Sequence, residues 1–164
     1  NLFVAQFIGA PMMNTFETKL VKSANGYYVD LFNKKLPVSG TKADGLKEKG
    51  IENRDILLGI RPEHLIVSKE ENEGTIPVTI EVNEMMGSEY HLHVASDDGT
   101  KIIVRIPTIN LSDKERENMV PGNKINLAFE PKAMHFFDPE SEINLLAGPN
   151  AVNSKGPIVL PTER

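Results

Sequence analysis

The sequence contains no cysteine and no tryptophan among its 164 residues. Without cysteine there can be no disulfide, no thiolate ligand for a metal and no cysteine nucleophile. Aromatic residues make up 6% of the chain, and they do not alternate with basic residues as in proteins that stack single-stranded nucleic acid. The net charge of -5 also lacks the basic excess that phosphate binding usually requires. We therefore expect no nucleic-acid partner.

A long apolar run is missing as well. No segment approaches the ~20 apolar residues that a transmembrane helix needs, and the N-terminus has no signal-like pattern. A cytoplasmic location is therefore expected. The sequence starts at Asn1 and enters directly on an apolar stretch, which suggests a piece of a longer protein. The remaining composition, 40% hydrophobic and 25% charged, is ordinary for a globular domain.

Short segments of alternating polarity fill most of the chain, and turn residues such as Ala24-Asn25-Gly26 and Asp97-Asp98-Gly99 separate them. Strands are predicted at residues 15–23, 27–32, 56–60, 75–82, 89–96, 100–106, 124–130, 134–137 and 143–146. Helical signals are limited to residues 2–8, a single turn within 41–50, and a short helix that a Ser112–Glu115 capping box opens. This pattern predicts an all-β fold, built as two small barrels or as one barrel with an extra sheet.

Signatures of catalysis and metal binding are also missing. There is no Gly-rich phosphate loop and no nucleophile elbow. His91 and His93 share one face of a predicted strand, as zinc ligands can, but neither His64 nor His135 supplies a third ligand at a useful spacing. We therefore expect no metal site, and we interpret the two histidines as part of a paired or solvated outer face.

Two polar interruptions of apolar strands are the candidate functional residues. In LLGIRPEHLIVS (57–68), Pro62 removes a donor from the strand ladder, and Arg61 needs a partner if it is buried. This segment, with Glu63 and His64, favours a structural or interface role over catalysis. The second interruption is the turn Gly87-Ser88-Glu89.

Four segments, in this order, resemble one known family: FVAQFIGAPMMN (3–14), LGIRPEHL (58–65), VNEMMGSEYHLHV (82–94) and PGNKINLAFEPKAMHFFDPESEINLL (121–146). Together they resemble the C-terminal regulatory domain of ATP-binding subunits of sugar-importing ABC transporters, of the maltose and multiple-sugar type. The resemblance implies an OB-fold-like barrel of the TOBE type, with an additional small β subdomain and short helices. It also implies a linking helix over 1–11 from a missing nucleotide-binding domain, the regulatory domain over 12–146 and a flexible tail over 147–164.

The resemblance implies a role in assembly. The chain itself would be no enzyme and would hold no cofactor, because ATP and Mg²⁺ belong to the missing domain. Its implied partners are a second copy of itself, that nucleotide-binding domain, membrane permease subunits and a possible regulatory protein, at the inner face of the cell membrane. Residues 61–64 and 87–89 would lie near the dimer seam or its supporting corner. The alternative is a small-oxyanion sensor barrel, although no Ser/Lys-rich pocket is evident.

Overall fold

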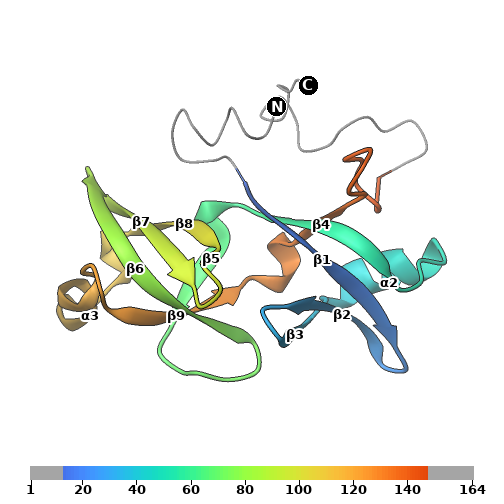
Figure 1. Cartoon of the computed structure of the whole chain (residues 1–164), viewed down its shortest axis with the longest axis horizontal. Helices are drawn as coiled ribbons and strands as arrows, with labels where there is room; N and C mark the ends of the chain where they lie inside the picture. The colour runs from blue at the N-terminus through green and yellow to red at the C-terminus, as the bar shows by residue number, and fades with distance from the viewer. Residues whose placement is uncertain (1–12, 148–164) are drawn as a thin grey trace. The chain divides into compact units, whose positions relative to one another are not determined.

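The computed structural model describes residues 13–147. The predicted helix at 2–8, the linking segment at 1–11 and the tail from 148 onward lie outside the described residues. The described chain divides into two compact units (Figure 1). The first unit combines the segment that ends at Arg61 with the segment that starts at Pro131, and the second is the continuous stretch Pro62–Glu130.

The first unit is a five-stranded antiparallel sheet with the strand order β10-β4-β1-β2-β3. Its strands are β1 (Asn14–Ser23), β2 (Gly26–Leu31), β3 (Lys34–Pro37), β4 (Arg54–Ile60) and β10 (His135–Phe137). Helix α2 (Gly40–Glu48) connects β3 to β4. Alternating apolar side chains such as Leu20, Val29 and Leu58 are fully buried and form the core of this unit.

The second unit is also a five-stranded antiparallel sheet, with the order β5-β9-β6-β7-β8. Its strands are β5 (Leu65–Ser68), β6 (Thr75–Met86), β7 (Glu89–Ser96), β8 (Lys101–Pro107) and β9 (Lys124–Phe129). Short helices η1 (Pro62–His64), η2 (Thr108–Asn110) and α3 (Asp113–Asn118) connect or precede them. Buried residues such as Val78, Leu92 and Val104 face inward at the period of two expected for strands.

Both units follow the same strand plan and differ in where the fifth strand lies in the chain. In each, a three-stranded meander is followed by a helix and by a fourth strand that returns to pair with the first, as β4 pairs with β1 and β9 with β6. A fifth strand then pairs with the fourth. In the second unit this fifth strand is β5, which follows β4, and in the first it is β10, which follows β9 through η3 (Pro131–Ala133). The second unit is therefore inserted between the last two strands of the first.

The predicted all-β class is confirmed, and so are the hairpins at 24–26 and 97–99 and the Ser112–Glu115 capping box. Two local predictions are wrong. Residues 143–146 form turns with a single bridge from Asn144 to Phe137 instead of a strand, because the Leu145 amide donates to the Phe136 carbonyl and the Asn144 side chain accepts from the Leu146 amide. The single turn expected within 41–50 is a nine-residue helix, whose Leu46 is buried in the core.

Candidate functional site

The Arg61–His64 segment lies where one unit ends and the next begins. Arg61 is the last residue of the first unit and is half-buried, whereas Pro62, Glu63 and His64 form η1 of the second. Pro62 is buried, and its missing N–H is tolerated because the strand stops here. The His64 carbonyl accepts from the Glu130 amide at 3.4 Å, which ties η1 to the end of β9.

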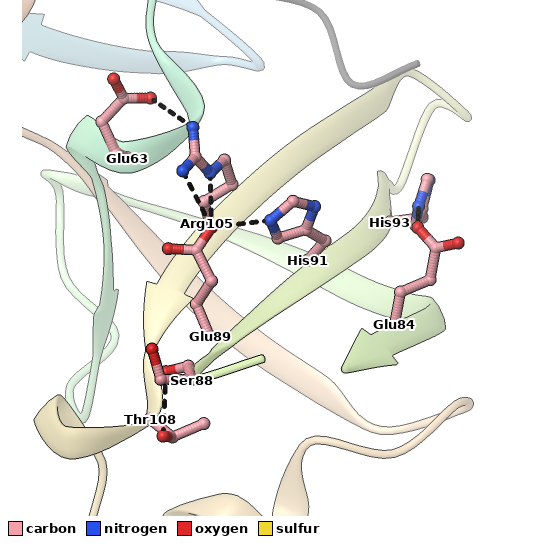
Figure 2. Close-up of polar contacts among 8 residues, drawn as sticks. All are labelled: Glu63, Glu84, Ser88, Glu89, His91, His93, Arg105 and Thr108. Carbon is pink, nitrogen blue, oxygen red and sulfur yellow. Dashed lines mark hydrogen bonds and ion pairs between the residues drawn. The ribbon is translucent and has the colours of Figure 1, made fainter. Parts of the chain in front are cut away.

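The Gly87-Ser88-Glu89 segment contains the tight turn between β6 and β7, where Met86 pairs with Glu89. Gly87 has φ +68, a left-handed conformation in which a side chain would be strained. The Ser88 carbonyl accepts from both the amide and the hydroxyl of Thr108, at 2.9 and 3.0 Å (Figure 2). These bonds fasten the turn to η2.

Arg105 on β8 connects the two predicted segments. Its Nε and Nη2 donate to Glu89 Oε1 at 2.9 and 2.8 Å, and its Nη1 lies 3.9 Å from Glu63 Oε1 (Figure 2). His91 Nε2 lies 2.7 Å from the same Glu89 oxygen. The structure therefore brings Glu63 and Glu89 together through Arg105, a residue that the sequence interpretation missed. We call Glu63, Glu89, His91 and Arg105 the charged cluster.

The electrostatics of the charged cluster favour positioning over proton transfer. Hydrogen bonds from His91 and then from Arg105 lower the pKa of Glu89 below its ordinary value. A carboxylate that stays ionised is poorly matched to acid–base catalysis near neutral pH. The charged cluster instead connects η1, β7 and β8 through polar contacts, which suits a structural role in fixing these elements to one another.

The two predicted strand histidines are both paired. His93 Nε2 lies 2.8 Å from Glu84 Oε1, and His91 contacts Glu89 as described above. Within residues 13–147, no group of three or more His, Asp or Glu side chains is placed to hold a metal ion. In the same part of the chain, no helix has both the length and the apolarity to cross a membrane.

A hollow of about 840 Å³ lies in the first unit. None of its lining residues belongs to segment 61–64 or 87–89. It is lined by ion pairs, including Lys19 with Asp55 at 2.9 Å and Arg54 with Asp138 at 2.5 Å. The amide of Ser141, together with Arg54, lowers the pKa of Asp138 to about 2. The bonds to Asp138 hold the loop that follows β10, whereas Lys19 and Asp55 pair across β1 and β4.

Two antiparallel OB-like sheets with short connecting helices define the class of the protein as an OB-fold module. Two family models match in chain order, the MalK OB fold domain over residues 9–65 and the TOBE domain over residues 58–137. The chain belongs to this family of TOBE and MalK-type OB-fold domains. The resemblance found in the four motifs is thereby confirmed.

Relatives among curated proteins carry matching names. The oligosaccharides import ATP-binding protein MsmX of Bacillus subtilis is 32% identical over 149 residues, which covers 88% of this chain and 38% of that protein. The multiple sugar-binding transport ATP-binding protein MsmK of Streptococcus mutans is 32% identical over 146 residues, covering 87% and 36%. The sn-glycerol-3-phosphate import ATP-binding protein UgpC of Burkholderia cenocepacia is 32% identical over 140 residues, covering 85% and 36%. The chain thus spans a little over a third of the length of these relatives.

A solved structure shares the fold. The cytoplasmic molybdate-binding protein ModG, crystallised with molybdate bound, superposes with a TM-score of 0.58 at 14% identity. The match covers 77% of this chain and 96% of that one. At this identity the similarity shows the fold alone.

Proposed function

We propose that this chain tethers two copies of an ATP-binding subunit of a carbohydrate ABC importer by forming a homodimer. The observation that carries the proposal is the match of both domain models in order, together with relatives named as sugar-import ATP-binding proteins. The parent subunit would be cytoplasmic, peripheral on the inner face of the membrane, and associated with permease subunits.

The physical value of such a tether is kinetic and thermodynamic. Two ATPase domains have to close on ATP and separate after hydrolysis in every transport cycle. If their regulatory domains remain joined, each closure becomes an intramolecular event at an effective concentration of roughly millimolar. The ATPase domains then need no new bimolecular encounter for each molecule of sugar.

The surface that we propose for the homodimer includes Glu63 and the Gly87–Glu89 turn. Glu63, Gly87 and Ser88 are exposed, and the charged cluster with the Thr108 bonds holds the two segments in place. A corner fixed in this way presents a preformed surface, which reduces the ordering cost of association. Because a twofold interface uses the same patch on both copies, one substitution there acts twice.

Concentration-dependent molar mass, measured by light scattering and sedimentation, tests the proposal. The chain should pass from one to two chain masses as its concentration rises. Ser88→Arg, which adds a charge to the exposed turn, should raise the dissociation constant at least about tenfold, a change of about 1.4 kcal/mol. The matched control is Ala24→Arg in the exposed β1–β2 turn of the first unit, which should dimerise normally. A chain that stays monomeric at every concentration, or equal effects of the two variants, would contradict the proposal.

A regulatory protein is a further proposed partner. A regulator that binds only the open arrangement of the two subunits shifts the equilibrium by its difference in affinity and no more. Moving the population from nearly all closed to nearly all open requires about 5.5 kcal/mol of such a difference. ATPase assays of the parent subunit with and without a candidate regulator measure this shift directly, and unchanged turnover with a bound regulator would exclude that candidate.

The alternative proposal is a small-oxyanion sensor on the same fold. A second hollow of about 500 Å³ lies beside α2 and is lined by Lys22, Lys47 and Asn25 among others. Calorimetric titration with molybdate, tungstate and sulfate decides this question. Saturable heat that is lost in a Lys22→Ala, Lys47→Ala variant would support the sensor, and an absence of heat would exclude it.

A further inference from the structure

Two consecutive methionines lie at the end of the β6–β7 hairpin in the second unit. Strand β6 pairs with β9 only as far as Thr79, but it continues along β7 to Met86. The side chains of Met85 and Met86 are 60% and 51% exposed. Successive residues of a strand point to opposite faces, so both faces of the hairpin end are open to solvent at this point.

The other methionines of the described chain are in a different environment. Met13, Met119 and Met134 are 4%, 3% and 1% exposed, and each is part of the buried apolar core. Because the sequence has no cysteine, thioethers are the most readily oxidised side chains that it offers. Access to solvent thus separates one adjacent pair of reactive sulfurs from three protected ones.

We propose that the Met85–Met86 pair is a reversible peroxide-oxidation site. Hydrogen peroxide transfers one oxygen atom to the thioether sulfur, so that an S–O bond forms, the O–O bond breaks and water leaves. The sulfur is oxidised to a sulfoxide and the peroxide is reduced. A thiol-dependent methionine sulfoxide reductase reverses the step, with two thiols becoming a disulfide and the sulfoxide oxygen leaving as water.

The two sulfoxides meet different surroundings. Met86 pairs with Glu89 across the hairpin, so its sulfoxide oxygen adds a hydrogen-bond acceptor on the face where His91 and Arg105 hold that carboxylate. Met85 pairs with Tyr90, whose side chain is buried at the edge of the core. Oxidation therefore converts an apolar hairpin end into a polar one without entering the core of the unit.

The consequence for assembly rests on the proposed function, because Met86 adjoins the Gly87–Glu89 turn of the proposed dimer surface. Loss of an apolar contact and gain of a sulfoxide dipole both disfavour burial of this surface. Oxidation of the pair should therefore weaken dimerisation, and reduction should restore it.

Peptide mass spectrometry after a hydrogen peroxide time course tests the site on the full chain. Met85 and Met86 should gain oxygen at least about tenfold faster than Met119 and Met134, and methionine sulfoxide reductases for both sulfoxide epimers should remove it from the folded chain. Met85→Leu, Met86→Leu is the matched control, in which the rapid gain of two oxygen atoms should disappear while the unfolding temperature stays within about 2 °C. Equal oxidation rates, or sulfoxides that resist the reductases until the chain is unfolded, would overturn the proposal.

Sedimentation of oxidised and reduced samples tests the effect on assembly. Oxidation should raise the dimer dissociation constant of the native chain several-fold and leave that of the double leucine variant unchanged. A native dimer that is indifferent to complete oxidation of both residues would refute control of assembly by this pair. An untreated chain that is monomeric throughout would instead count against the proposed dimer, while selective and reversible oxidation would still support the site.

Discussion

Replacing Gly59 with alanine should destabilise the first unit for a steric reason. Gly59 lies in β4, between Thr15 of β1 and His135 of β10. An added Cβ would lie 2.4 Å from Met13 Sδ and 2.9 Å from Phe137 Cε2, both closer than real Cβ contacts allow. Met13 can move part of its side chain, but Phe137 is 1% exposed and therefore has little room to shift. Overpacking of this kind costs about 1–3 kcal/mol, which corresponds to a fall of roughly 2–12 °C in Tm at this chain length.

Thermal and urea unfolding measure this cost, with the transition of the first unit followed separately if the two units do not unfold together. The matched control is Gly40→Ala at the start of α2, where no atom lies within 4 Å of an added Cβ. It should change stability by no more than about 0.5 kcal/mol. Phe137→Leu should recover part of the loss in a double-mutant cycle. If Gly59→Ala is no more costly than Gly40→Ala, the steric reasoning is wrong.

Three further predictions concern separate parts of the fold. Residues 62–130 alone should fold, because this segment contains all five strands of the second unit. Native-like circular dichroism and dispersed amide resonances would show folding, and an unfolded product would contradict the strand assignment. Asp138→Asn should lower Tm at pH 7. The pKa of Asp138 is about 2 in the folded chain and 3.8 ordinarily, so the stability that its carboxylate contributes is full above roughly pH 4 and is lost as the pH falls through 2. The difference in Tm between the variant and the native chain should therefore shrink at low pH. A difference that stays constant with pH would exclude ionisation of Asp138 as its cause. Ser112→Ala removes the cap of α3 and should cost about 0.5–2 kcal/mol in urea unfolding, with the same loss in the 62–130 fragment.

Local signals predicted the hairpins and the capped helix because the interactions that form them lie within a few residues. Asp97-Asp98-Gly99 forms a turn in which Gly99 has φ +88 and Asp98 accepts from the Thr100 amide. The Ser112 hydroxyl accepts from the Glu115 amide, and the Glu115 carboxylate accepts from the Ser112 amide. The strand predicted at 143–146 failed because this segment forms one bridge to β10, from Asn144 to Phe137, and then turns instead of extending a ladder.

Half of the candidate site was accessible from the sequence. The segments 61–64 and 87–89 were identified as polar interruptions of apolar strands, and their use in an interface stays a prediction. Arg105 was missed because a charged residue in a strand of alternating polarity reads as an ordinary side chain on the solvent-facing side. Its role depends on the register that places it opposite His91 and on the turn that brings Glu89 within 2.8 Å.

The amino-acid sequence by itself determined the all-β class, most strand positions and, through four ordered motifs, the family. Each of these depends on local periodicity, turn chemistry or a continuous segment. Only the tertiary structure decided that β5 completes the second sheet and β10 the first, and that Glu63 and Glu89 share Arg105. The physical reason is that antiparallel pairing joins strands that lie far apart in the chain. Which strands pair depends on the core that they share rather than on the sequence of either strand alone.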